Sequence, residues 1–213
     1  MKQNRSNFGV AVVNGMIYAV GGSVVGFISK NAERFDPKTK RWEVIPDMMY
    51  KRSQPFCVSM NEKLYVIGGN KDILQYPINE CYDPKRNVWE QVPFMQKSRR
   101  GAAAVCFEDK IYVTGGEHLY ENKRFDSVEV FDGKHWANAP PMLSPRSSHG
   151  SLVFQRELWV VGGKNSEKTV LNDCETFNFA SQQWTRVRVA SFSCLYLTIF
   201  LGNELSAILS RRF

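Results

Sequence analysis

This chain of 213 residues has few of the side chains on which metal and redox chemistry depend. It contains three histidines and five cysteines, and no two cysteines have the Cys-x-x-Cys spacing of a zinc or dithiol motif. The cysteine count is odd and no secretory signal opens the sequence, a pattern typical of a reducing compartment. We therefore expect buried free thiols, no cofactor, no metal and a cytoplasmic location.

Catalytic motifs are also absent from the sequence. His118, His135 and His149 do not stand at metal-ligand spacing from another histidine, cysteine or carboxylate. There is no Gly-x-Ser-x-Gly nucleophile turn and no His-Glu-x-x-His motif. An enzyme is consequently the least favoured class of function. We expect His149 to be a surface side chain that makes hydrogen bonds in a binding loop.

Long apolar runs are scarce, and basic residues outnumber acidic ones. Residues 189–203 carry no charge, but this segment includes Ser, Thr, Gly and Asn and is too short for a membrane span. The net charge of +7 suggests nucleic-acid binding, yet the basic residues are scattered and no aromatic–basic stacking platform is present. An acidic protein or peptide partner therefore fits better than nucleic acid.

Glycine, by contrast, follows a strict pattern. Gly-Gly pairs recur every 47 residues, each with an aromatic residue three positions before it and an arginine sixteen positions before it. Such self-similarity indicates a repeat architecture. The pairs are Gly21-Gly22, Gly68-Gly69, Gly115-Gly116 and Gly162-Gly163, the aromatics are Tyr18, Tyr65, Tyr112 and Trp159, and the arginines are Arg5, Arg52, Arg99 and Arg146. A tryptophan follows each pair, at Trp42, Trp89, Trp136 and Trp184.

Each repeat is predicted to form four short strands. In the first repeat these are residues 9–13, 16–20, 32–35 and 41–44, with a favourable hairpin turn at Asn14-Gly15. The matching turns, which suit the hairpin less well, are Asn61-Glu62, Glu108-Asp109 and Gln155-Arg156. No helical pattern follows the Gly pairs, so they indicate strand ends and not a phosphate-binding loop.

Four-stranded units of this length, repeated, are typical of β-propeller blades. Stacked blades bury faces that a single sheet leaves in water. We therefore expect the four tryptophans to pack in the core of the propeller and not in a ligand cage.

The residues after each Gly pair resemble kelch repeats over residues 1–187, divided at about 1–47, 48–94, 95–141 and 142–187. In each repeat a Glu, an aromatic residue and an Asp or Asn precede the Trp, as in Glu33, Phe35, Asp36 and Trp42. The resemblance implies an all-β kelch propeller with four recognisable blades. Pro and Met residues after the Trp, at Pro46/Met48, Pro93/Met95 and Pro140/Met142, are similar to those of BTB–kelch proteins.

BTB–kelch proteins use the propeller to hold a substrate for a cullin–RING ubiquitin ligase, so the resemblance implies a protein-interaction module, with an actin-binding kelch protein as the alternative. The sequence shows no BTB-like segment, so we expect no cullin binding by this chain alone.

The resemblance also implies that a partner contacts loops on one rim. The candidate residues are Asn7, Ser23, Gln54, Asn70, Arg100, Glu117, Ser148, His149 and Lys164. Relatives often carry an Arg two positions after the repeated arginine, whereas this chain has Asn7, Gln54, Gly101 and Ser148 there. A strongly acidic peptide is thereby disfavoured. The repeated arginines could tie blades together or contact a ligand.

Both ends of the chain depart from the repeat. Met1 precedes Arg5 by the same interval as Met48 precedes Arg52, so we expect a truncated isoform or fragment of a longer repeat array. At the other end, Leu209-Ser210 replaces the next Gly pair. We expect residues 188–213 to be an apolar tail that forms no blade, with a short strand at 192–201 as the alternative. The sequence leaves open whether the four blades close, stay open or pair with another chain.

Overall fold

The computed structural model describes residues 1–69, 79–118, 120–121 and 123–188, in which there are strands, turns and loops but no helix. Four antiparallel sheets of four strands each follow one another along the chain. The first contains β1 (Gly9–Val13), β2 (Met16–Val20), β5 (Ala32–Asp36) and β6 (Arg41–Ile45). The second contains β7 (Phe56–Met60), β8 (Lys63–Ile67), β9 (Asn79–Asp83) and β10 (Val88–Val92).

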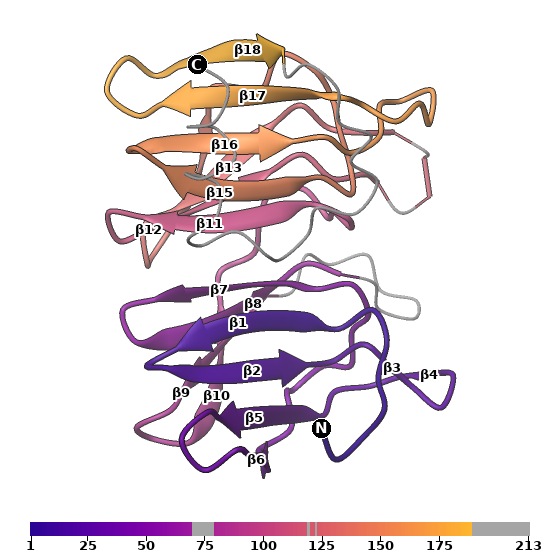
Figure 1. The fold of residues 1–213 in the computed structure, drawn as a ribbon, viewed down its shortest axis with the longest axis vertical. Coiled ribbons are helices and arrows are strands. Elements are labelled where there is room, and N and C mark those ends of the chain that lie inside the picture. The colour runs from indigo at the N-terminus through magenta and orange to yellow at the C-terminus, as the bar shows by residue number, and fades with distance from the viewer. Residues whose placement is uncertain (70–78, 119, 122, 189–213) are drawn as a thin grey trace.

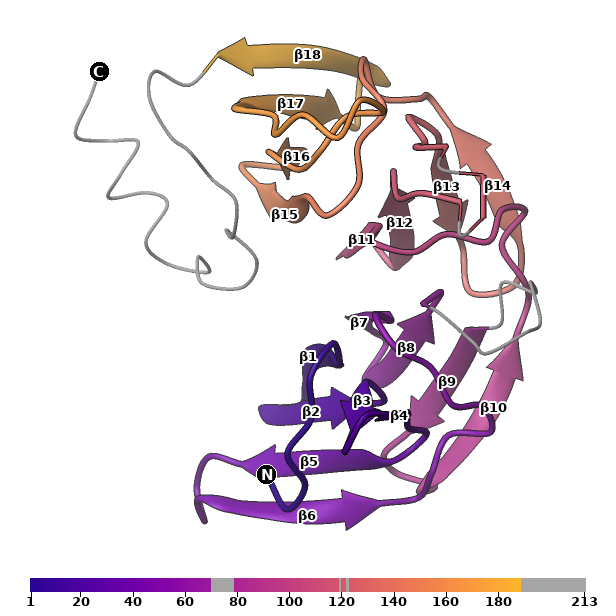
Figure 2. The same cartoon turned by 90° about the vertical axis from the view of Figure 1, so that its right-hand side faces the viewer.

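The third sheet contains β11 (Ala103–Phe107), β12 (Lys110–Thr114), β13 (Val128–Phe131) and β14 (Trp136–Ala139). The fourth contains β15 (Gly150–Phe154), β16 (Glu157–Val161), β17 (Asp173–Asn178) and β18 (Gln183–Arg188). Figure 2 shows the sheets arranged as the blades of an open arc, with the first and fourth blades at its ends. The predicted all-β propeller architecture with four blades is confirmed.

All four blades begin with a hairpin turn of the same geometry. Both turn residues have positive φ, for example 50° and 76° at Asn14 and Gly15, and 49° and 60° at Gln155 and Arg156. Paired positive φ values match the right-handed twist of the flanking strands. The turn therefore persists in repeats where Glu, Asp, Gln and Arg replace the preferred Asn-Gly.

The core consists of three apolar clusters, one at each junction between neighbouring blades. In the first junction Val13, Tyr18 and Val20 pack against Leu64 and Val66, all of them buried. The aromatic residue before each of the first three Gly pairs contacts an aromatic residue of the next blade, in the ring pairs Tyr18–Tyr82, Tyr65–Phe131 and Tyr112–Phe179. The repeated aromatics therefore hold blade to blade.

Three of the tryptophans, Trp89, Trp136 and Trp184, lie at the edge of these clusters and not in their centres. Trp42, Trp89, Trp136 and Trp184 are each half-buried on the outermost strand of a blade. Each ring packs on the aromatic residue of the neighbouring strand, as Trp136 does on Phe131 with 5.0 Å between ring centroids. As expected, Trp89, Trp136 and Trp184 pack against the core clusters, but they are only partly buried because an outer strand has water on one side.

The indole N–H groups explain this position. Trp89 donates to the carbonyl of Pro46 at 2.7 Å, and Trp136 donates to that of Pro93 at 2.8 Å. Trp184 makes the same bond to Pro140 at 2.9 Å. Each bond joins the outer strand of one blade to the end of the blade before it.

The C-terminal expectations fall largely outside the described residues. Strand β18 ends at Arg188, and both the proposed strand at 192–201 and the missing Gly pair at Leu209-Ser210 lie beyond it. Within residues 1–69, 79–118, 120–121 and 123–188, we find no apolar helix of membrane-spanning length.

Candidate functional site

The two predicted loop sets lie on the same edge of the arc. One set joins the last strand of a blade to the first strand of the next, and the other follows each Gly pair. Figure 1 shows both on its right-hand side, whereas the hairpin turns lie on its left. We call these the loop edge and the turn edge.

A buried arginine fixes the base of each interblade loop. The guanidinium of Arg99 donates to the carbonyl of Gly115 at 2.7 Å and to the carboxylate of Glu129 at 2.7 Å. Glu129 also accepts the backbone N–H groups of Gln96 and Lys97. The charge of Arg99 is thus paired within its own blade, where only 1% of the residue is exposed.

The same arrangement recurs in every repeat. Arg5, Arg52 and Arg146 each donate to the first Gly of the pair sixteen residues later. Each also pairs with the Glu of the third strand, in Arg5–Glu33, Arg52–Glu80 and Arg146–Glu175. These side chains are buried, so the repeated arginines have a structural role and are not exposed to a partner.

The Gly pairs pack closely against the backbone of the following repeat and form hydrogen bonds with it. The N–H of Gly22 donates to the carbonyl of Arg52 at 2.8 Å, and that of Gly116 donates to Arg146 at 2.8 Å. A Cβ on Gly115 would stand 2.4 Å from the same Arg146 oxygen, and φ at Gly115 is +59°. Both the close approach and the positive φ require glycine there. Arg52, Arg99 and Arg146 therefore each bind their own blade through the side chain and the preceding blade through the backbone carbonyl.

Four backbone positions form a repeated feature of the loop edge. Asn7, Gln54, Gly101 and Ser148, which we call the rim ring, all have φ between 53° and 58°. The N–H of Gln54 donates to the carbonyl of Asn7 at 2.7 Å, and that of Ser148 donates to Gly101 at 2.7 Å. The side chains of Asn7, Gln54 and Ser148 are exposed. Three uncharged polar side chains and one glycine thus occupy these equivalent positions.

A charged group, the rim cluster, joins the loops of the third and fourth blades. It consists of Arg100, Glu117, Arg124 and Ser147. The carboxylate of Glu117 accepts Arg100 at 2.9 Å and Arg124 at 3.0 Å. Arg124 also donates to the hydroxyl of Ser147 at 2.8 Å. Two cations on one carboxylate leave a net positive charge, and the side chain of Arg100 is 35% exposed.

The remaining predicted loop residues have different positions. Ser23 and Lys164 are half-buried and pair through their backbones with Ser6 and Ser147. Asn70 lies outside the described residues. Arg124 and Ser147 were not predicted. Ser147 follows the repeated arginine directly, a position occupied by Ser6 and Ser53 in earlier repeats, so the repeat itself could have identified it.

The prediction for His149 was wrong, because this side chain is 4% exposed and cannot reach a partner. Its Nε2 atom lies 2.8 Å from the hydroxyl of Thr114, and a Cβ built on Gly115 would stand 2.7 Å from its ring carbon Cε1. Burial lowers the pKa of His149 to about 3, so the imidazole is neutral at pH 7. The equivalent residues in the other repeats are Phe8, Pro55 and Ala102, an apolar pattern that indicates burial.

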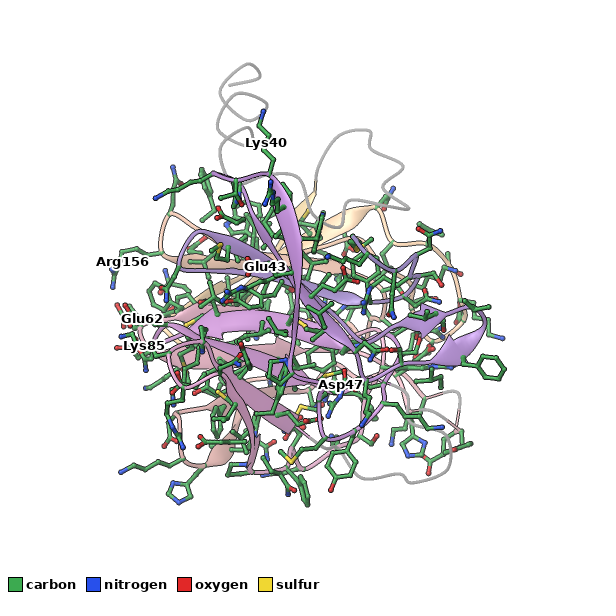
Figure 3. The ribbon with its side chains drawn as sticks, turned by 90° about the horizontal axis from the view of Figure 1, so that it is seen from below. Lys40, Glu43, Asp47, Glu62, Lys85 and Arg156 are labelled. Carbon is green, nitrogen blue, oxygen red and sulfur yellow. The ribbon has the colours of Figure 1, made fainter. Side chains whose placement is uncertain are left out.

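The turn edge has a different character. Figure 3 labels Glu62, Lys85 and Arg156, which come from the hairpin turns on this side. Glu62 pairs with Lys85, and Arg156 pairs with Glu108, through side chains that are mostly exposed. Exposed pairs of this kind contribute little to stability or to specific recognition.

The described residues offer little for catalysis. They contain no group of three or more His, Cys, Asp or Glu that could hold a metal ion. Burial raises the pKa of the Cys57 thiol to about 12 and that of the Cys81 thiol to about 11. Both thiols are protonated at neutral pH and are poor nucleophiles.

Two comparisons with known proteins agree with this geometry. A family model described as the KLHDC2/KLHL20/DRC7 Kelch-repeats domain matches residues 7–194. The F-box/kelch-repeat protein At5g26960 of Arabidopsis thaliana is 40% identical over 48 residues. That match covers 22% of this chain and 12% of the relative, so it extends to a small part of the relative's length.

Proposed function

Because this chain belongs to the kelch-repeat family, whose repeats generally serve as protein–protein interaction modules, we propose that it binds a partner polypeptide through the loop edge. The observation that carries this proposal is the rim ring. Its exposed polar side chains stand on backbone that is fixed by buried Arg–Glu pairs and by bonds between neighbouring blades. Rigid scaffolds that present variable loops are typical of binding proteins.

We further propose that the partner is a substrate of a ubiquitin ligase. The Pro and Met residues after the first three of the repeated tryptophans, which resemble those of BTB–kelch proteins, support this proposal. The similarity to a protein whose name includes both an F-box and kelch repeats supports it as well. In this role the chain supplies substrate binding, and a separate module supplies contact with the ligase. Actin binding is the competing function.

The experiment removes the rim-ring side chains without changing the backbone. Gly101 already occupies this left-handed position, so glycine fits at the other members of the ring. The loop-edge variant is therefore Asn7→Gly, Gln54→Gly and Ser148→Gly. The control is Glu62→Gly, Asp109→Gly and Arg156→Gly on the turn edge, where Gly15 occupies the equivalent position.

Peptides displayed on phage from a random-sequence library are selected on the wild-type chain, and their affinities are then measured by fluorescence anisotropy. We expect the loop-edge variant to weaken binding by about tenfold or more and the turn-edge variant to leave it unchanged. Failure to enrich any peptide, or loss of binding in the turn-edge variant alone, would contradict the proposal. Co-sedimentation of the wild type but not the loop-edge variant with filamentous actin would favour the competing function.

A further inference from the structure

The first blade carries an apolar projection on its loop edge. Strands β3 (Ser23–Val24) and β4 (Phe27–Ile28) form a two-stranded ribbon that extends beyond the blades in Figure 1. Val25 is 87% exposed and Phe27 is 78% exposed, the largest values among the exposed large apolar residues of the described chain. Large apolar side chains that are exposed to water on a projecting ribbon indicate an interaction surface.

The turn at the tip of this ribbon is strained. Val25 and Gly26 have φ values of 50° and 81°, and Val25 occupies a position at which hairpins strongly prefer Asn. A β-branched residue with positive φ is an outlier, and such strain concentrates at functional sites. The ribbon thus presents a valine where the fold alone favours a polar residue.

Beside the ribbon lies a groove of about 510 Å³, a volume typical of ligand sites. One wall is the ribbon, through Val24, Phe27 and Ile28, and the other is the interblade loop, through Met49, Tyr50 and Lys51. Lys30 and Asn31 complete the lining, and none of the described residues that line the groove is acidic. The groove is therefore apolar with two positive charges.

Both walls are held in place by the backbone. The N–H of Ser29 donates to Gly22 at 2.9 Å, and the N–H of Arg52 donates to Ser29 at 3.0 Å. On the opposite wall, Glu80 accepts the N–H groups of Met49 and Tyr50 at 2.6 and 3.3 Å. A groove formed before binding loses less entropy when it is occupied.

The charged side chains at the groove indicate what kind of segment it can bind. Lys30 lies 3.7 Å from Asp47, in a pair whose side chains are 53% and 37% exposed. Such an exposed pair is weak, so a carboxylate of a partner can replace Asp47 at little cost. An apolar groove with lysines and no acid complements a segment that has a large apolar side chain and acidic neighbours.

We propose that this groove binds a short peptide segment of a partner protein, with an aromatic or large aliphatic side chain between the ribbon and the interblade loop and an acidic side chain facing Lys30. The proposal rests on the partner-binding function of the loop edge. Beyond that function, the proposal specifies where on the first blade the partner binds and which side chains its segment carries.

The test uses the selected peptides and three variants of the full chain. We expect enriched peptides to combine an aromatic or large aliphatic residue with acidic residues. Phe27→Ser and Lys30→Glu should each weaken their binding by about tenfold. Val44→Ser is the control, because Val44 is 65% exposed on the same blade but does not line the groove. Library selection on Lys30→Glu should enrich basic instead of acidic peptides.

The outcomes separate this proposal from the general function. Peptides that lose affinity in the loop-edge glycine variant but not in Phe27→Ser or Lys30→Glu would overturn the groove and leave the function standing. If no peptide is enriched, both fail. A concentration-dependent dimer that Phe27→Ser abolishes, measured by sedimentation velocity without peptide, would assign the groove to a second copy and also overturn the proposal.

Discussion

The interblade junctions and the loop edge are two regions built from neighbouring residues. The junctions are nearly identical in every repeat, whereas the loop edge varies. Arg99 is buried and repeats in every blade, whereas Arg100, the next residue, is partly exposed and is replaced by serine in the other repeats. Each junction has the same aromatic contact, the same Arg–Glu pair and the same glycine approach. The loops differ in length, charge and pairing. The difference indicates that the junctions maintain the fold and that the loops determine what it binds.

The contrast between the junctions and the loop edge is tested most strongly by replacing Arg99 and Arg100 one at a time. Arg99→Leu leaves Glu129 buried without its counter-charge and should lower the free energy of unfolding by about 3–5 kcal/mol. Arg100→Leu removes a partly exposed pair with Glu117 and should lower it by about 1 kcal/mol or less. Urea denaturation of both variants measures the difference. Equal losses would mean that the loop edge is as structural as the junctions.

The second prediction concerns pH. His149 has a folded pKa of about 3, below its ordinary value of 6.5, so the unfolded chain binds the extra proton between these values. Stability from this group is complete above pH 6.5 and falls as pH decreases towards 3. The loss should approach about 1.4 kcal/mol per pH unit. His149→Gln should remove this slope between pH 6.5 and 4.5, as measured by thermal unfolding. An unchanged slope would show that His149 is accessible to protons in the native state.

The third prediction separates close approach from backbone conformation. Gly115→Ala places a Cβ against the Arg146 carbonyl and should cost about 1–3 kcal/mol. Gly133 also has positive φ, at 97°, but a Cβ there would meet nothing within 4 Å. Gly133→Ala should therefore cost about 1 kcal/mol, because only the left-handed backbone opposes the methyl group. If chemical denaturation gives the same value for both, the glycines are required only for their φ angles.

The smallest expected effect belongs to the indole hydrogen bonds. Trp136→Phe keeps a ring on Phe131 but removes the donor to Pro93. The free energy of unfolding should fall by about 0.5–1.5 kcal/mol. Partner binding should not change, because neither Trp136 nor Pro93 belongs to the rim ring or lines the groove. A loss of peptide affinity at unchanged stability would instead connect the outer strand to the site.

The sequence predicted the junctions well because they repeat. Gly115, Arg99 and Trp136 each have equivalents at a fixed interval, so sequence comparison within the chain identifies them without a structure. The functions of Arg99 and Trp136 were harder to derive, since an arginine can bind a ligand or a buried carboxylate, and a tryptophan at an outer strand is only half-buried.

The loop edge was predicted less completely. Arg124 and the β3–β4 ribbon lie between repeated positions, where loop length varies and no equivalent residue exists to compare. The turn at Val25-Gly26 also lacks the Asn that usually indicates a hairpin. Burial of His149 could have been inferred from its apolar equivalents, but its hydrogen bond to Thr114 depends on packing between blades that no local pattern contains.

The central claim is that the loop edge binds a partner while the junctions and the turn edge remain unchanged. Hydrogen–deuterium exchange of the full chain, with and without a selected peptide at saturation, tests it most directly. We expect slower exchange in residues 23–30 and 47–54 and no change in the hairpin turns at 61–62, 108–109 and 155–156. Protection confined to those turns, with none in the loops, would contradict the account.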